Sequence, residues 1–408
     1  MPRGETADVV IAGAGCAGLS LAVHLVQAGI TDRRILLTDP RTAYGRDRTW
    51  CFWDTGRPMP FDGAVTHDWN QWRVAGIGEE VIQQSSRFMY RHIPAHRFYE
   101  TAHEILRGFA NVEIRLGCGV ETLRDEGESV RVGTDSGDVM AGVVFDSRPC
   151  AHRRTSQISG SPAPGENAIS LMQHFLGVRV KADRDVFDPA TTTLMDFRVS
   201  QQSGIHFLYI LPFSRREALL ETTYISTGRL TRDDYLASLK EYCATNYPGT
   251  AFSLLGEEAG VIPMHAGTLA SRHRKPVRVI TAGVAGGMVK PSTGYAFLSI
   301  QRWSEEIARQ MAQGVEVPLS PAPRSRRAVL MDRVFLSYLR AHPAETPALF
   351  VRLFRQTPTH RLVRFLSDAG TLGDDIAVVR ALPKVAFMKQ ASHEITESRL
   401  VSLQRRTA

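Results

Sequence analysis

The glycine pattern near the N-terminus constrains the fold more than any other feature of this chain. A run rich in β-branched residues leads directly into Gly13, Gly15 and Gly18. Apolar residues at helical spacing follow over 19–28, and a second apolar run ends at Asp39. Strand, glycine turn, helix, strand and terminal acid occur in the order of a dinucleotide-binding βαβ unit. The sequence therefore predicts an α/β chain that begins with a Rossmann-like domain.

Each residue of this pattern has a physical role. Gly13 permits the tight turn, Gly15 lets the backbone approach a pyrophosphate, and Gly18 lets the helix pack closely on the strand. The phosphates are expected at the helix N-terminus, where free N–H groups favour negative charge. Asp39 can accept hydrogen bonds from both hydroxyls of an adenosine ribose, and its charge disfavours a 2′-phosphate there.

A second glycine-rich loop lies late in the chain. It follows a predicted strand at 277–282 and precedes a predicted helix at 295–313. Its candidate cofactor-binding residues are Gly283, Gly286, Gly287, Pro291 and Gly294. A second helix N-terminus of this kind can face the middle of a dinucleotide. Two such units far apart in one sequence are typical of two-domain FAD enzymes, so the pattern favours FAD over NAD.

Composition and charge narrow the class of partner. The chain has 408 residues, of which 43% are hydrophobic, which is enough for two domains with a large core. Its net charge is +7, yet it contains no lysine-rich tract or alternation of basic and aromatic residues. This pattern argues against nucleic-acid binding and favours an acidic membrane surface as the partner of the positive charge.

The cysteines indicate the compartment. The five cysteines are scattered, odd in number and without CxxC spacing, which argues against a disulfide framework or a zinc site. A reducing cytosol is therefore expected. The first strand begins too early to leave room for a signal peptide, and no apolar run approaches the length of a membrane span. We expect a cytoplasmic protein that associates peripherally with the inner face of the membrane.

Periodicity predicts three structural regions. Residues 1–167 and 265–330 form a discontinuous FAD-binding domain, and alternating residues at 168–264 predict an antiparallel substrate sheet. Residues 331–408 predict a helical C-terminal region. Arginines there surround the apolar residues Phe335, Leu339, Phe350, Phe354 and Phe365. Such a region can be an amphipathic cap over the substrate domain or a basic, apolar surface that docks on lipid.

Two arginines are further candidates for cofactor binding. Arg48 lies in the basic and aromatic stretch 46–54, which follows the predicted adenine-binding unit. This stretch can face cofactor or substrate, or it can be a buried aromatic cluster. Arg97 precedes a predicted helix and can contact a phosphate or the flavin, although a solvated arginine is the alternative.

Motifs along nearly the whole chain resemble those of the flavoprotein lycopene cyclases of carotenoid biosynthesis, of the bacterial type. The motifs are Asp47-Arg48-Thr49-Trp50-Cys51-Phe52-Trp53, Gln173-His174-Phe175-Leu176-Gly177, Leu194-Met195-Asp196, Phe207-Leu208-Tyr209-Ile210-Leu211-Pro212, Leu219-Leu220-Glu221-Thr222-Thr223-Tyr224-Ile225 and Gly286-Gly287-Met288-Val289-Lys290-Pro291-Ser292-Thr293-Gly294-Tyr295. The resemblance implies conversion of the linear ψ-ends of lycopene to β-ionone rings without net redox change. It also implies reduced FAD as cofactor and NADPH as the electron source.

This chemistry predicts which residues carry the reaction. Ring closure on a polyene needs a proton donor, stabilisation of a carbocation, and a base. An apolar pocket raises the pKa of a carboxylic acid, which can then act as the donor at neutral pH. Glu221 lies on a predicted strand and matches the glutamate that the family uses for protonation. Asp196 is the second candidate, as a supporting carboxylate or proton relay, and a structural acid is its alternative.

Three other functions remain open at this stage. A redox flavoenzyme of the same superfold, such as a prenyl-lipid reductase or aromatic hydroxylase, would consume NAD(P)H stoichiometrically. A cyclase of the same family could act on another polyene or terpenoid. A flavin or carotenoid carrier would bind the pigment unchanged. Val284 follows Gly283 where flavin enzymes of this broad fold commonly carry an Asp that binds the ribityl chain, which mildly disfavours a hydroxylase.

Overall fold

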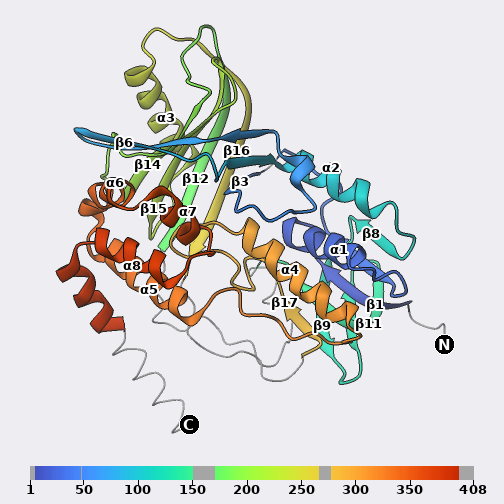
Figure 1. Cartoon of the computed structure of the whole chain (residues 1–408). Helices are drawn as coiled ribbons and strands as arrows, with labels where there is room; N and C mark the ends of the chain where they lie inside the picture. Colours follow the sequence, from blue (N-terminus) through green and yellow to red (C-terminus); the bar gives the residue numbers. More distant parts are fainter. Residues whose placement is uncertain (1–4, 47, 150–170, 266–276, 395–408) are drawn as a thin grey trace.

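The computed structural model describes residues 5–46, 48–149, 171–265 and 277–394 (Figure 1). A nucleotide-binding-type unit with a central sheet occupies one side, and a long, mostly antiparallel sheet rises from the other. C-terminal helices lie below the long sheet. The predicted fold class, an α/β chain with a Rossmann-like unit, an antiparallel sheet and a helical C-terminal region, is confirmed. The loop predicted at 150–167 lies outside the described residues.

The first sheet has a parallel centre because helices connect its strands on one face. Its order is β8-β2-β1-β11-β10-β9, and β17 pairs with β11. The parallel strands are β1 (Glu5–Ala12), β2 (Ile35–Asp39), β8 (Val112–Leu116), β11 (Gly137–Asp146) and β17 (Val279–Thr281), and the antiparallel strands are β9 (Val120–Asp125) and β10 (Val130–Thr134). Helices α1 (Cys16–Gln27) and α4 (Phe297–Ala312) pack against each other, and α2 (Ala95–Leu106) lies beside α1. Segments from both ends of the chain thus share one core.

A small sheet joins the two halves of the molecule. It pairs β7 (Tyr90–Pro94) with β3 (Thr49–Trp53) and β4 (His67–Trp69), and the short helix η1 (Asp62–Ala64) lies beside α2. Successive side chains of a strand point to opposite faces. On β3, Phe52 packs in the core of the first sheet, whereas Trp53 packs in the core that the second sheet shares with the C-terminal helices.

The second sheet has the order β16-β12-β15-β14-β13-β5-β6. Its strands are β12 (Leu171–Ala182), β13 (Thr191–Asp196), β14 (Ile205–Pro212), β15 (Glu217–Ser226), β16 (Phe252–Met264), β5 (Gln71–Gly76) and β6 (Glu79–Gln84). Helix α3 (Arg232–Asn246), capped by Thr231, covers one face. The domain boundaries predicted at 167 and 265 stay a prediction. Strands β5 and β6, which lie in the first predicted segment, pair with β13 and so belong to this second sheet.

The C-terminal region is helical, as predicted. It contains α5 (Arg326–Ala341), η3 (Pro343–Glu345), α6 (Thr346–Gln356), α7 (Thr359–Leu366) and α8 (Leu372–Ala381), and residues 384–394 are also helical. Leu339, Phe350 and Phe354 are buried against the second sheet, and Phe335 and Phe365 are partly buried. The surface that the sequence suggested for lipid docking is therefore not formed by these residues, because they fill the core of a cap. Among the described helices, none has both the length and the hydrophobicity that crossing a bilayer requires.

Candidate active site

The first glycine turn is closed on one side and open on the other. Gly13 has a φ of +100°, and a Cβ on Gly18 would stand 1.9 Å from the Gly13 carbonyl oxygen. A Cβ on Gly15, in contrast, would have only the Arg41 guanidinium within 4 Å, at 3.7 Å. Gly15 is also the N-cap of α1 and provides no side-chain cap for the free N–H groups. This open N-terminus fits an anionic phosphate group.

Asp39 lies at the end of β2, as predicted, and is buried beside this turn. Its Oδ2 accepts the Ala14 N–H at 2.8 Å, and its Oδ1 accepts Arg41 Nε at 2.8 Å. The backbone N–H of Arg41 also donates to Oδ1, at 3.0 Å. An ionised carboxylate has about four acceptor positions, so capacity remains for one ribose hydroxyl. Arg41 was not predicted. The signal that could have found it is a cation two residues after the strand-terminal acid, where it neutralises Asp39 and faces Gly15.

The late glycine loop meets the first turn. Gly283 has a φ of +65°, and a Cβ added at this position would stand 3.1 Å from Ala17 Cβ at the start of α1. A Cβ on Gly286 would stand 2.7 Å from the carbonyl oxygen of Thr281, so only glycine fits there. The structure therefore brings together the two predicted glycine units.

The rest of this loop is a turn that delays the start of the helix. Gly287 and Gly294 both have positive φ, and Pro291 is buried. The N–H of Lys290 donates to the carbonyl oxygen of Tyr295 at 2.7 Å. Helix α4 consequently begins at Phe297 instead of the predicted residue 295.

A buried ionic cluster anchors this loop to the helical cap. Lys290 Nζ lies 2.6 Å from Asp368 Oδ1 and 3.5 Å from Asp332 Oδ1, and all three side chains are nearly inaccessible. Ser292 donates to Asp332 Oδ1 at 2.6 Å, and Arg324 donates to the carbonyl oxygen of Val289. Asp332 belongs to α5 and Asp368 follows α7, so the loop is fixed by contacts with both helices. Lys290 and its partners were not predicted, because their pairing depends on long-range packing.

The two candidate arginines occupy different places. Arg48 is exposed. Burial raises the pKa of Cys16, and the positive charge of Arg48 partly offsets this rise. Because Cys16 is the first residue of α1, Arg48 lies near the start of that helix. Arg97 lies on the exposed side of α2, where Nη1 forms an ion pair with Glu100 at 3.2 Å. Only Arg48 is thus placed near the glycine turns by a described interaction.

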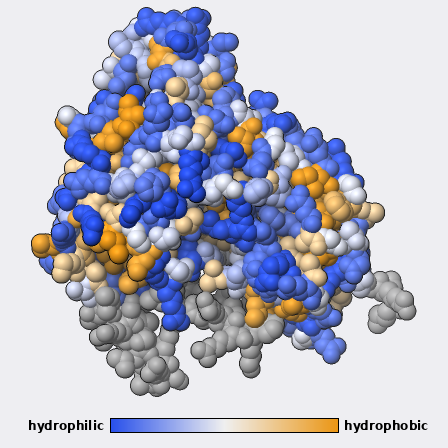
Figure 2. Space-filling model, in the orientation of Figure 1, coloured by the Kyte–Doolittle hydropathy of each residue, from blue (hydrophilic) through white to orange (hydrophobic). Residues whose placement is uncertain are grey.

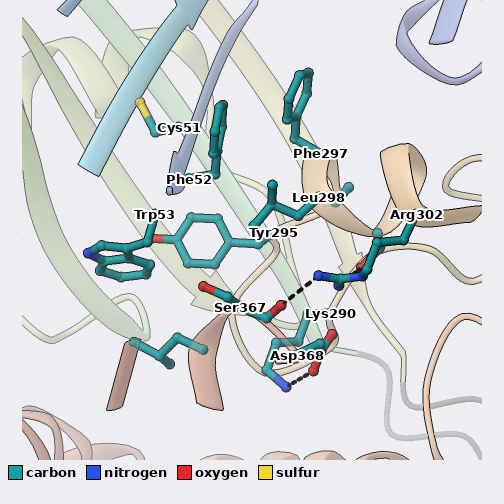
Figure 3. A pocket seen from close by; sticks show the side chains of 13 residues that line it. Cys51, Phe52, Trp53, Lys290, Tyr295, Phe297, Leu298, Arg302, Ser367 and Asp368 are labelled. Atoms are coloured by element: carbon teal, nitrogen blue, oxygen red, sulfur yellow. Dashed lines mark hydrogen bonds and ion pairs between the residues drawn. The ribbon is translucent and has the colours of Figure 1, made fainter. Parts of the chain in front are cut away.

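An aromatic cavity lies between β3, the late loop and the end of α7 (Figure 3). Its volume is about 20 Å³, which is room for about one water molecule. Phe52 stacks on Phe297 with ring centroids 4.8 Å apart, and Trp53 meets the Tyr295 ring edge-on at 5.6 Å. Arg302 closes one side by donating to the carbonyl oxygen of Ser367 at 3.1 Å. The walls therefore combine apolar rings with a few fixed polar groups, as small-molecule sites do.

Glu221 lies on β15, as predicted, in a row of residues that faces this side of the second sheet. Its neighbours across the strands are Tyr209 on β14 and Gly177 on β12. Glu221 is only 8% exposed, and Thr223 Oγ1 donates to its Oε1 at 2.8 Å. Burial and, second, the negative charge of Glu258 raise the pKa of Glu221 to about 8. A carboxyl group in this state keeps its proton at neutral pH.

Glu258 continues the same row on β16 and was missed from the sequence. Gly177 pairs with both glutamates, and a Cβ there would stand 3.5 Å from Glu221 Cβ and 3.2 Å from Glu258 Cγ. Thr49 Oγ1 on β3 donates to Glu258 Oε2 at 2.9 Å. The sequence holds no signal that separates Glu258 from the adjacent Glu257, whereas in the structure Glu257 is exposed and Glu258 is half-buried.

A buried chain of tyrosine hydroxyls leads from this row toward the late loop. The Tyr90 hydroxyl lies 3.0 Å from the hydroxyl of Tyr209 and 3.0 Å from that of Tyr295. The thiol of Cys51 contacts Tyr209, and the charge of Glu221 contributes to raising the pKa of Cys51. Burial raises the pKa of all three tyrosines and of Cys51, so these groups stay protonated.

Asp196 lies on the opposite face of the same sheet. The hydroxyl of Tyr242 on α3 donates to its Oδ2 at 2.8 Å, and Arg198 binds both oxygens at 2.6 and 2.8 Å. These bonds hold the pKa of Asp196 below its ordinary value although burial acts in the other direction. Its row contains Thr222, whose side chain points away from that of Glu221. The structure therefore does not bring the two predicted carboxylates together.

Comparisons with known proteins show the family of this chain. A family model described as "Lycopene cyclase protein" matches residues 8–392. A lycopene beta-cyclase from Paracoccus sp. is 26% identical over 403 residues, which cover 93% of this chain and 95% of that enzyme. One from Pantoea ananas is 24% identical over 394 residues, with coverage of 93% and 96%.

Solved structures show the same fold at low identity. A flavoprotein/dehydrogenase from Cytophaga hutchinsonii superposes with a TM-score of 0.63 at 14% identity, covering 95% of this chain and 100% of that one. A geranylgeranyl bacteriochlorophyll reductase-like protein from Thermoplasma acidophilum gives 0.60 at 12% identity, covering 94% and 98%. The family resemblance seen in the sequence is confirmed, and the chain belongs to the lycopene cyclase family.

Proposed function

We propose that this protein converts the ψ-ends of lycopene to β-ionone rings by acid–base chemistry, with Glu221 as the acid and no net redox change. The observation that carries the proposal is the burial of Glu221, with a pKa of about 8, near Cys51, which lines the aromatic cavity. Lycopene has no polar groups, so its site must be apolar. In such surroundings a carboxyl group that holds its proton at neutral pH is the expected proton donor.

The reaction balances without a transfer of electrons. The Glu221 proton forms a C–H bond with the terminal double bond and leaves a tertiary carbocation. The π electrons of the next reacting double bond form the ring C–C bond, which moves the positive charge to another tertiary carbon. Loss of a proton from the neighbouring carbon restores a double bond. The product is an isomer of the substrate, and the protein supplies one acid and one base.

FAD is the cofactor that the glycine turns fit. Gly15 and the uncapped start of α1 would hold the pyrophosphate, Asp39 would bind the ribose, and the loop from Gly283 to Gly287 would lie against the flavin end. When bound in its reduced state, FAD would supply negative charge that stabilises a nearby carbocation in a site of low dielectric. Tyr295 connects this loop by hydrogen bonds to the row that contains Glu221.

A redox count separates the cyclase from a redox flavoenzyme. Purified protein is given lycopene in detergent micelles with FAD and NADPH under argon, and both ring-ended product and oxidised NADPH are measured. The proposal predicts product in large excess over oxidised NADPH, because the reductant only primes the flavin. A hydrogenated product formed one-to-one with NADPH oxidation supports the reductase alternative, and unchanged lycopene contradicts the proposal.

We also propose that helix α8 and residues 384–394 dock on an anionic membrane surface. Exposed apolar side chains gather there, as Figure 2 shows over the C-terminal helices. The apolar residues, which are 45 to 85% exposed, are Leu372, Ile376, Val379, Val385 and Met388, and exposed Arg380, Lys384 and Lys389 lie among them. An apolar face with a basic rim is typical of an interfacial helix.

Vesicle sedimentation tests this surface. Wild type is expected to sediment with phosphatidylglycerol vesicles and weakly with phosphatidylcholine vesicles. The double substitution Ile376→Asp with Val379→Asp should weaken phosphatidylglycerol binding by about tenfold or more. Leu254→Asp, at an exposed position on β16, is the matched control and should bind as wild type does. Equal binding by the double variant would contradict the proposal.

A further inference from the structure

We infer that Glu258 is the base that removes the proton from the ring, so that Glu221 and Glu258 act as an acid–base pair across Gly177. This inference rests on the proposed cyclisation and names a second residue for the same site. The two carboxyl groups come from strands that are not neighbours, β15 and β16, and β12 lies between them.

Strand register places the two side chains together. Gly177 on β12 pairs with Glu221 on one side and with Glu258 on the other, so the three residues share one row and one face. Any side chain at 177 would stand between the two carboxyl groups. A Cβ there would already be 3.2 Å from Glu258 Cγ and 3.5 Å from Glu221 Cβ. The glycine therefore leaves a shared space that both glutamates border, together with Leu219, whose Cδ1 would stand 3.2 Å from the same Cβ.

The two environments assign different roles to the two acids. Glu221 is almost completely buried, which favours its neutral form, whereas Glu258 is partly exposed and accepts a hydrogen bond from Thr49 Oγ1 at 2.9 Å. Hydrogen bonds that a carboxylate accepts favour its charged form. Two carboxyl groups whose surroundings differ in this way divide into an acid and a base. After burial, the charge on Glu258 is the second cause that raises the pKa of Glu221.

Other groups near Glu221 are poor bases. Burial raises the pKa of the Cys51 thiol on β3 and of the Tyr209 hydroxyl on β14, and a protonated thiol or phenol accepts no further proton readily. Tyr90 on β7 is protonated for the same reason. Asp196 lies on the other face of the sheet. Of the described groups that surround Glu221, Glu258 is thus the one suited to take up a proton.

The proton balance closes over one turnover. Glu221 gives its proton to the terminal double bond and becomes a carboxylate. The ring carbon then loses a proton to Glu258, which becomes neutral, and the C–H electrons form the new double bond. Transfer of that proton from Glu258 to Glu221 across the shared space restores the starting state. No oxidant, reductant or water is consumed in these steps.

The test compares Glu258→Gln with Glu257→Gln in the lycopene assay, each measured from pH 6 to pH 9.5. Glu257 is the matched control, because it is the preceding residue of β16 and forms an exposed ion pair with Arg232. The inference predicts a loss of kcat of about a hundredfold or more for Glu258→Gln and wild-type kcat for the control. It also predicts that the alkaline decline of residual activity moves to lower pH, because the charge that raises the pKa of Glu221 has been removed.

Two further measurements separate the possible failures. Glu258→Asp keeps a carboxylate, one methylene further back, so it should recover part of the kcat that Glu258→Gln loses. This recovery separates loss of the carboxylate from poor folding of Glu258→Gln. Near-wild-type kcat and an unmoved alkaline decline in Glu258→Gln would overturn the inference while leaving the cyclase proposal intact. Unmodified lycopene with the wild-type protein would instead contradict the proposed function itself.

Discussion

Replacing Glu221 by glutamine should stabilise the protein relative to wild type, and this difference should grow as the pH rises. The pKa of Glu221 is raised from its ordinary value of 4.5 to about 8, with burial as the largest cause. Between these values the unfolded chain releases the proton and the folded protein keeps it. Folding stability therefore falls with rising pH by up to about 1.4 kcal/mol per pH unit through this one group. Below pH 4.5 the contribution is fully present, and it is lost by pH 8.

The expected magnitude follows from the width of this window. Over the whole window the penalty reaches about 5 kcal/mol, and a glutamine, which carries no charge, avoids it. Glutamine also retains an oxygen that can accept from Thr223, so the local bond is kept.

Urea unfolding at pH 5, 6, 7 and 8 measures the effect. The quantity compared is the free energy of unfolding of Glu221→Gln minus that of wild type, a difference from which the other titrating groups largely cancel. It should increase with pH. Glu217→Gln, on the same strand and partly exposed, is the control and should give a nearly flat difference. A flat difference for Glu221→Gln would refute the account of a carboxyl group kept neutral by burial.

Three further predictions concern the glycine turn, the ionic cluster and the second acid. Gly15→Ala should fold normally but weaken FAD binding by about tenfold or more in flavin fluorescence titration, whereas Gly18→Ala should lose stability because its Cβ would stand 1.9 Å from a carbonyl oxygen. Lys290→Met removes the cation that pairs with the buried Asp368 carboxylate and should lower the free energy of unfolding by about 3–5 kcal/mol. Arg309→Gln, in an exposed pair, should cost less than about 1 kcal/mol. Asp196→Asn should lower the urea midpoint by loosening α3 but leave the pH profile of cyclisation unmoved, and a moved profile would give Asp196 a part in proton transfer.

The sequence was informative where a local pattern carries the geometry. The turn from Gly13 to Gly18 and the strand ending at Asp39 follow from short-range rules, because a positive φ and a close helix contact each demand glycine at a set spacing. The contact between Gly283 and Ala17 could be expected because both loops were predicted to bind one cofactor. Glu221 was found through its motif, and its burial was not visible in the sequence.

The sequence was not informative where register or packing decides. Glu257 and Glu258 are adjacent and identical, and only the pairing of β16 with β12 turns Glu258 toward Glu221. Asp196 and Glu221 both occur on strands with apolar neighbours, yet they face opposite sides of one sheet. Phe350 and Phe354 suggested a lipid-facing surface, but tertiary contacts bury them in the cap. Helical periodicity identifies an apolar face without saying what covers it.

Pigment composition in lycopene-accumulating cells tests the central claim most directly. Cells expressing wild type, Glu221→Gln and the control Glu217→Gln are extracted, and linear and ring-ended carotenoids are separated by chromatography. The account predicts ring-ended carotenoid with wild type and with Glu217→Gln, and unchanged lycopene with Glu221→Gln at equal protein level. Ring formation by Glu221→Gln at the wild-type rate would contradict the assignment of the buried glutamate as the acid that starts cyclisation.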